Sequence, residues 1–143
     1  MQIYQKHITL LPHKRGFNLI TDEILSQLPE IRASKAGLLN LFIQHTSASL
    51  SISENADPTV RMDLETHFNK SVPEDEIYYR HIDEGTDDMT SHIKNVIIGS
   101  SLSIPIIDKK LALGTWQGIY LCEHRNSARS RKIVATLIGE SDE

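Results

Sequence analysis

The chain has 143 residues, of which 39% are hydrophobic and 6% aromatic, and its formal net charge at pH 7 is −4. A chain of this length buries enough surface to fold without disulfide bonds or structural metals, so we expect one domain spanning residues 1–143. The acidic balance and the few aromatic residues argue against a nucleic-acid-binding or membrane-surface protein. Small-molecule partners are therefore expected.

The cysteine content and the first residues of the chain indicate where in the cell the protein is located. Cys122 is the single cysteine, which excludes an internal disulfide and is typical of a reducing cytoplasm. The N-terminal segment MQIYQKHITLL lacks the apolar core of a signal peptide, and no run approaches the roughly 18 apolar residues of a membrane span. We therefore expect a cytoplasmic protein with no membrane partner.

The first third of the chain predicts a strand, a helix and a second strand. Residues 3–11 mix apolar and polar side chains, which is typical of a half-exposed strand. Thr21 is placed to cap a helix whose apolar face holds Ile24, Leu25 and Leu28. Residues 37–44, GLLNLFIQ, are nearly all apolar and too few for a typical helix, which predicts a buried strand.

The apolar alternation changes phase at His45 and Thr46. Alternate residues up to Ile43 are apolar, and the apolar set that starts at Ala48 has the opposite parity. Such a slip predicts a bulge or a bend, and bulges often re-aim side chains beside active sites. Thr46 and Ser47 are therefore candidate substrate contacts, with ordinary strand polarity as the alternative.

A helix start follows at Asp57 and Pro58, which suit the N-cap and the first helical position. Glu54 and Asn55 lie just before it and have no evident part in the helix start. They are therefore candidate site residues.

Residues 79–101, YRHIDEGTDDMTSHIKNVIIGSS, contain two histidines and a second helix. Asp87 or Asp88 is the expected N-cap of a helix that begins near Met89 and ends at Gly99. His92 falls within its expected buried face, where an imidazole needs a hydrogen-bond partner or a metal. The other members of that face are Met89, Ile93, Val96 and Ile97.

The histidines suggest a metal site. His81 lies in the acidic loop before the helix, so it can approach His92 if that loop folds back. Histidine is the commonest metal ligand, and a third ligand would complete an open, catalytic-type site. We expect His45 to be that ligand. The alternative is that all three rings are hydrogen-bonded core residues.

The last third predicts strands and a cationic cluster. Residues 102–106 alternate around Pro105, which favours an edge strand or a bulge. A turn at 108–110, short strands up to residue 123 and a last strand at 132–138 follow, with Trp116 expected as a packed aromatic. Four cations lie close together near the last strand and form either a solvated face or an anion site: Arg125, Arg129, Arg131 and Lys132. Guanidinium groups bind phosphate oxygens in paired hydrogen bonds, so Arg125 and Arg131 are candidate contacts for a small phosphorylated metabolite.

Four long segments, HTSASLSISENADP, RHIDEGTDDMTSHIK, GSSLSIPI and LGTWQGIYLCEHR, resemble in this order the YjbQ-like family, also called the secondary thiamine-phosphate synthase family. The resemblance covers essentially the whole chain. It implies an α+β fold, a single compact domain with a mainly antiparallel sheet and about three helices, that assembles as a homotrimer. It also implies that His45, His81 and His92 meet at a metal. Two segments depart from the family pattern by lacking glycines, at 108–110 and at 127–130.

The activity that the resemblance implies joins hydroxymethylpyrimidine diphosphate to thiazole phosphate with release of pyrophosphate, as a weak or secondary reaction. Histidine ligands favour zinc, whereas a diphosphate substrate also suits magnesium. In this hypothesis Arg125 and Arg131 neutralise the leaving pyrophosphate, and Glu54 and Asn55 orient the reacting cation. Two alternatives stay open: a metal-dependent hydrolase of a small phosphorylated metabolite with Glu54 as base, and a non-catalytic, metal-dependent trimer that binds such a metabolite.

Overall fold

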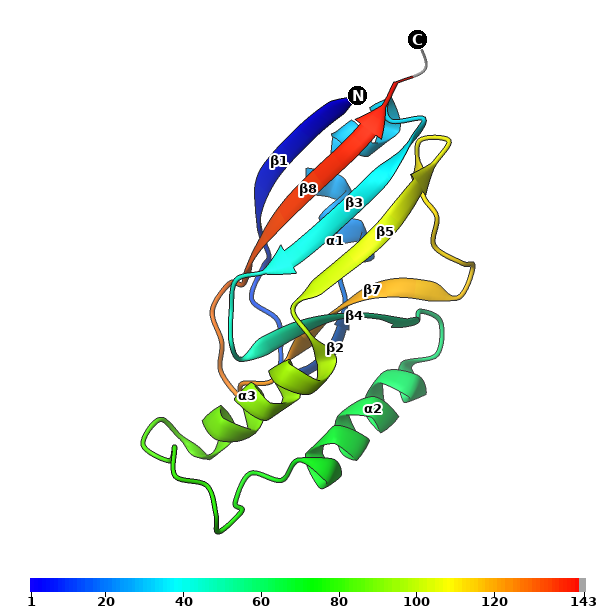
Figure 1. Ribbon diagram of the computed structural model, residues 1–143. Coiled ribbons are helices and arrows are strands. Elements are labelled where there is room, and N and C mark those ends of the chain that lie inside the picture. Colours follow the sequence, from blue (N-terminus) through cyan, green and yellow to red (C-terminus); the bar gives the residue numbers. More distant parts are fainter. Residues whose placement is uncertain (142–143) are drawn as a thin grey trace.

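A computed structural model describes residues 1–141, which form two antiparallel sheets, three α-helices and one 3-10 helix (Figure 1). The larger sheet has the strand order β1-β8-β3-β5-β6, and the smaller sheet has the order β2-β7-β4. The predicted single α+β domain is therefore confirmed. The elements in chain order are β1 (Gln2–Thr9), β2 (Gly16–Leu19), α1 (Thr21–Gln27), η1 (Pro29–Ala33), β3 (Ala36–Ile43), β4 (Ala48–Glu54), α2 (Pro58–Ser71), α3 (Thr86–Ile98), β5 (Ser101–Ile107), β6 (Lys110–Leu111), β7 (Gln117–Glu123) and β8 (Lys132–Glu140).

The main core lies between the inner faces of the two sheets. Leu39 and Leu41 of β3 point into it from the larger sheet, and Ile119 and Leu121 of β7 point into it from the smaller one. Ile24 of α1 closes the core on the side where the helix packs behind the larger sheet (Figure 1). Burial of such aliphatic side chains stabilises the fold by about 1.5–3 kcal/mol each.

The second face of the smaller sheet is covered by α2 and α3. Phe17, Tyr120 and Cys122 form a separate apolar cluster there, against Phe68 of α2. The Phe17 and Phe68 ring centroids are 5.6 Å apart. Cys122 is buried, and burial raises the pKa of its thiol. The smaller sheet is therefore buried on both faces.

The larger sheet has one open face. Leu38 and Phe42 of β3 point to this face and are 41% and 48% exposed, with Ile138 of β8 beside Leu38. No helix covers the side of the sheet that faces the viewer in Figure 1. The strand predicted at residues 37–44 is confirmed, but only one of its faces is buried, because hydrophobicity alone does not reveal which face lacks a covering layer.

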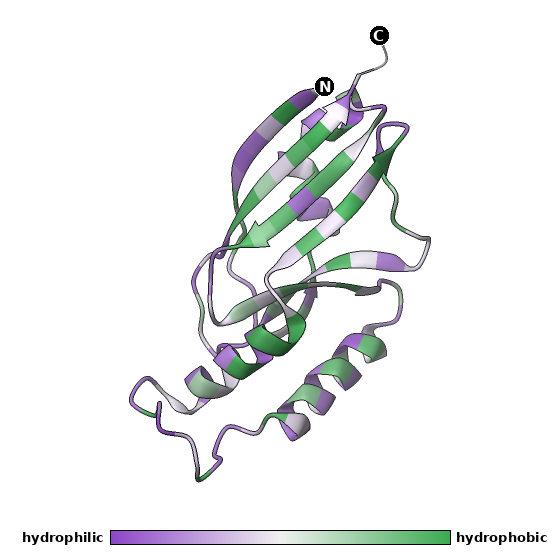
Figure 2. Cartoon of the chain, in the orientation of Figure 1, coloured by the Kyte–Doolittle hydropathy of each residue, from purple (hydrophilic) through white to green (hydrophobic). Residues whose placement is uncertain are grey.

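Helix α3 begins earlier than predicted, and its buried face is polar. Gly85, with φ of 103°, is the N-cap, so Asp87 and Asp88 lie in the first turn and are not caps. The residues of α3 that are buried are Asp87, Asp88, Thr90, Ser91 and Lys94. Val96 and Ile97 are instead 82% and 58% exposed, in the hydrophobic end of the helix in Figure 2. The polar face is buried because it meets groups that accept hydrogen bonds: Thr90 Oγ1 donates to the Val72 carbonyl at 2.7 Å, and Lys94 Nζ donates to Asn69 Oδ1 of α2 at 2.7 Å.

Other local predictions are confirmed or corrected. Asp57 caps α2, since its carboxylate accepts from the Thr59 amide at 2.9 Å, and Gly99 ends α3 at φ of 105°. Thr21 is the first residue of α1 and not its cap; its hydroxyl accepts instead from the Ile119 amide at 2.9 Å. Trp116 is 65% exposed and is not the packed aromatic that the sequence predicts.

Two further observations concern β5 and membrane-spanning helices. Strand β5, which contains Pro105, is nearly an edge strand, because β6 pairs only with Ile106 and Ile107. Within residues 1–141, no helix is long and apolar enough to cross a bilayer.

Candidate metal centre

The side chains of His81, Asp88 and His92 meet at the N-terminal end of α3. Asp88 and His92 are four residues apart, so they lie on the same side of the helix one turn from each other. His81 comes from the loop between α2 and α3. Asp88 Oδ2 lies 2.7 Å from His81 Nε2 and 3.1 Å from His92 Nε2. Each residue offers one ligand atom, and these three atoms all lie within 4.8 Å of one another.

Arg125 fixes the carboxylate of Asp88 from the opposite side. Its Nη1 donates to Asp88 Oδ1, and its Nε donates to Asp87 Oδ2 at 2.9 Å. Burial acts to raise the pKa of Asp88, but the hydrogen bond from His81 and the nearby charges of His92 and Arg125 outweigh it and hold the pKa below its usual value. Asp88 is therefore ionised at neutral pH, with Oδ2 directed to the two histidines.

The orientation of His92 is set by the backbone of the β3–β4 connection. His92 Nδ1 lies 2.8 Å from the carbonyl oxygen of Thr46. A carbonyl only accepts, so Nδ1 carries a proton. In the neutral imidazole, Nε2 would then point its lone pair at an ionised Asp88 oxygen 3.1 Å away, which is repulsive. A cation or a second proton at this position removes the repulsion.

These residues fit a transition metal. Two imidazoles and one carboxylate form a set that proteins use for zinc and other divalent ions, and three ligands leave a coordination position open. The hydrogen bond from a ligand histidine to a carbonyl, as His92 makes, is the usual device that orients such a ring. The side chains of His81 and His92 are 46% and 29% exposed, so the open side is accessible to solvent. Magnesium fits less well because it prefers oxygen ligands.

The structure places His45 outside this group. The Lys132 amide donates to His45 Nε2 at 2.8 Å, and Arg131 Nη1 lies 3.3 Å from Nδ1. Burial, followed by the positive charge of Arg131, lowers the pKa of His45. The segment after β3 does reach the site, but through the Thr46 carbonyl and not through the His45 ring. A metal-binding role for His45 stays a prediction, and it requires the ring to release the Lys132 amide.

The two arginines expected to bind phosphate are both paired with carboxylates of the chain. Arg131 Nε donates to Glu123 Oε1 at 2.7 Å, and its Nη2 donates to Ser47 Oγ at 3.0 Å. Arg125 is bound to Asp87 and Asp88 as described above. A phosphate role for these arginines and a substrate role for Ser47 therefore require exchange of partners, and both stay predictions.

Glu54 and Asn55 have structural contacts that the sequence does not suggest. A Glu54 carboxylate oxygen accepts from the Asp57 amide at 2.9 Å, at the start of α2. Asn55 Nδ2 donates to the carbonyl of Gln117 at 3.0 Å. Glu54 ends β4, about 20 Å at ~3.3 Å per residue from Ala48, where the strand begins just after Thr46. Within one chain, these two residues are therefore remote from the histidines.

Asp88 is the site residue that sequence reasoning missed, because its position before an apolar run predicts a helix cap. The four-residue spacing between Asp88 and His92 is the available signal, since it places a carboxylate and an imidazole on one helical face.

Comparison with known proteins assigns the family. The family model described as UPF0047 protein YjbQ-like matches residues 6–140. This chain belongs to the UPF0047 (YjbQ-like) family. It is 55% identical to the UPF0047 protein YjbQ of Salmonella typhimurium over 137 residues, which cover 96% of this chain and 99% of that protein. The UPF0047 protein YjbQ of Escherichia coli O157:H7 is 53% identical over the same length and shares of the two chains.

Two solved structures have the same fold. A conserved hypothetical protein of Thermus thermophilus matches with a TM-score of 0.80 and 29% identity, over 93% of this chain and 99% of that one. A YbjQ-like protein of unknown function from Sulfolobus solfataricus matches with a TM-score of 0.84 and 23% identity, over 97% and 99%. At 23% identity, the match to the Sulfolobus solfataricus protein bears on the fold alone.

Proposed function

We propose that this protein is a metal-dependent enzyme that acts on a small phosphorylated metabolite, with zinc held by His81, Asp88 and His92. One observation carries the proposal: His92 has its Nδ1 proton committed to the Thr46 carbonyl, and its Nε2 faces an ionised carboxylate at 3.1 Å. A divalent cation bound by both groups would remove their repulsion, as would a second proton on the His92 ring. His81 completes a set of three ligands on an accessible side of the molecule.

The reaction we favour is of the thiamine-phosphate synthase type, with release of pyrophosphate as a weak or secondary activity. It is supported by the ordered segments that resemble the family. A divalent ion, when bound, polarises phosphate oxygens as a Lewis acid. The chain's own part is to hold the site: Arg125 keeps Asp88 ionised and oriented, and Thr46 keeps the His92 ring in one tautomer.

Hydrolysis of a phosphate ester is the second candidate, and one observation favours it. Arg125 and Arg131 are both ion-paired within the chain, so little uncommitted positive charge remains for a departing pyrophosphate. A phosphate monoester needs less neutralisation, and a zinc ion held by His81, Asp88 and His92 would supply the activation of water that its hydrolysis requires. If neither pyrophosphate nor phosphate is released, the third candidate applies, which is metal-dependent binding of a metabolite without turnover.

We also propose that the chain forms a homotrimer in the cytoplasm. The open face of the larger sheet supports self-association, since it exposes Ile3, Leu38, Phe42 and Ile107 in one layer of paired strands. Exposed apolar patches of this kind mark interaction surfaces.

The first experiment is metal analysis of untagged protein. Wild type is expected to contain about one zinc per chain and His92→Ala substantially less, whereas His67→Ala is the matched control because His67 is exposed on α2, away from the site. Zinc-loaded protein is then assayed for pyrophosphate release from the diphosphate–thiazole pair and for phosphate release from a monoester panel. Equal metal content in wild type and His92→Ala would falsify the ligand assignment.

A further inference from the structure

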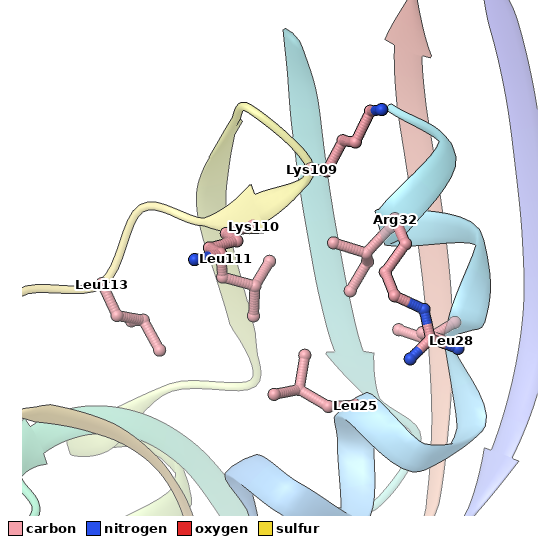
Figure 3. Close-up of a pocket in the computed structure, with 8 residues that line it drawn as sticks. Leu25, Leu28, Arg32, Lys109, Lys110, Leu111 and Leu113 are labelled. Atoms are coloured by element: carbon pink, nitrogen blue, oxygen red, sulfur yellow. The ribbon is translucent and has the colours of Figure 1, made fainter. Parts of the chain in front are cut away.

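A cavity of about 380 Å³ lies between α1, η1 and the β6 region, apart from the histidines. Its apolar wall is formed by leucines that converge from two sides, from α1 on one and from β6 and the segment after it on the other (Figure 3). The apolar lining residues are Leu25, Leu28, Ile31, Leu111 and Leu113. Small-ligand pockets start at about 300 Å³, so this cavity has room for a small molecule.

The polar lining of this cavity is entirely basic. Arg32, Lys109 and Lys110 are its charged residues, and no carboxylate is among the described residues that line it. The chain as a whole has a net charge of −4, so a basic lining is a local reversal of its charge. In Figure 3 Lys109 points away from the leucines. Lys110 pairs with Ile107, which is 60% exposed on the open face of the sheet, so its side chain lies on that face and not on the face of Leu111. Arg32 is therefore the cation available to a ligand in the cavity.

The turn that presents the lysines has an unusual backbone. Asp108 and Lys109 have φ of 48° and 69°, and they are the non-glycine residues with positive φ in residues 1–141. Left-handed conformation costs roughly 1–2 kcal/mol in a residue with a side chain. Amides of the turn donate to the Lys35 and Ser34 carbonyls at 2.7 and 3.0 Å, which anchors it next to η1. Positive φ at both residues is what the two-residue type I′ loop between β5 and β6 requires, so the hairpin itself explains this conformation.

We propose that this cavity binds a linear aliphatic carboxylate, with the alkyl chain on the leucines and the carboxylate at Arg32. An apolar interior with a guanidinium at its rim matches an amphipathic anion with one charged end. A group the size of water takes ~30 Å³, so the cavity has room for on the order of ten such groups. A chain of about eight carbons therefore fills it.

A calorimetric titration series tests the alkyl chain and the head group separately. Each added methylene should tighten binding about fourfold while the chain remains inside, so octanoate should bind about 15-fold more tightly than hexanoate. 1-Octanol, which has the same chain without the charge, should bind at least about tenfold more weakly than octanoate.

Variants identify the site. Arg32→Gln should weaken octanoate binding about tenfold with no change in melting temperature, because its side chain is exposed. Lys70→Gln, at an exposed lysine on α2, is the matched control and should bind as wild type. Leu25→Trp fills the cavity and should abolish binding.

Three results would each overturn the proposal: no saturable octanoate binding up to a concentration on the order of 10 mM, equal affinity for octanol and octanoate, or undiminished binding in the Leu25→Trp variant. Zinc content is measured in the same samples. Because the cavity shares no residue with the metal centre, failure of one proposal leaves the other unaffected.

Discussion

Asp88 and His92 face each other across one turn of α3, with Asp88 Oδ2 3.1 Å from His92 Nε2. The carboxylate is fixed by Arg125 and the ring by the Thr46 carbonyl, so neither side chain can turn away without losing a hydrogen bond. The pair is therefore prearranged for a cation. A metal and a proton compete for the same place, as is general for histidine ligands.

Zinc should stabilise the folded protein through this pair. At a free concentration of 100 times its dissociation constant, a ligand adds about 2.7 kcal/mol, which corresponds to a rise in melting temperature of roughly 5–10 °C for a chain of this size. Asp88→Asn should lose most of that rise, measured by differential scanning calorimetry with and without zinc. Asp83→Asn, an exposed acid of the same loop, should keep it. An undiminished rise in Asp88→Asn would contradict the assignment of Asp88 as a ligand.

His124 should make the protein less stable in mild acid. Burial, followed by the positive charges of Lys94 and Arg15, lowers the pKa of its ring to about 3, against 6.5 ordinarily. Between these values the unfolded chain binds the proton more readily than the folded one, so stability falls as the pH decreases below 6.5. Proton uptake by His124 on unfolding should lower the free energy of unfolding by about 2 kcal/mol between pH 7 and pH 5.

Urea unfolding of His124→Gln at several pH values isolates this contribution. The glutamine amide can keep a hydrogen bond to the buried Ser49 hydroxyl, which lies 2.9 Å from His124 Nε2. The variant should be less stable than wild type at about pH 7.5, and the difference should shrink toward pH 5. Parallel pH profiles for the two proteins would show that His124 does not titrate as inferred.

The Glu123–Arg131 pair should be important for stability. The Glu123 side chain is fully buried and Arg131 is 8% exposed, and Arg131 Nε donates to Glu123 Oε1 at 2.7 Å. Glu123→Gln leaves a buried guanidinium without its counter-charge, which should cost about 3–5 kcal/mol in the free energy of unfolding. Asp63→Asn on the exposed side of α2 is the control and should change stability by less than ~0.5 kcal/mol. A loss below ~1 kcal/mol in Glu123→Gln would mean that Arg131 is solvated and available to a ligand.

A charge on the open sheet face should separate the proposed trimer. Phe42→Glu places a carboxylate in the centre of that face, where association would bury it without a partner. Light scattering should give about three times 16.2 kDa for wild type and the mass of one chain for the variant. Met62→Glu, at a 64% exposed position on α2, should stay trimeric. A wild type that is already monomeric would exclude the trimer.

Local sequence signals predict the elements well where neighbouring residues make the structure. Asp57 and Pro58 begin α2 as expected, because an N-cap and a proline act within one turn of chain. Gly99 ends α3 for a similar reason, since its positive φ suits a residue without a side chain. The change of phase at His45 marks a real break, which is the passage from β3 in the larger sheet to β4 in the smaller one.

The tertiary structure decided which faces are covered and which side chains meet. The alternation in β3 is visible in the sequence, but Leu38 and Phe42 are exposed because no layer packs on their side of the sheet. Asp88 has the sequence context of a helix cap, and it became a site residue because Arg125, 37 positions later, lies against it. Contacts between residues so far apart depend on how whole elements pack, and a pattern of neighbouring residues along the chain does not reveal that packing.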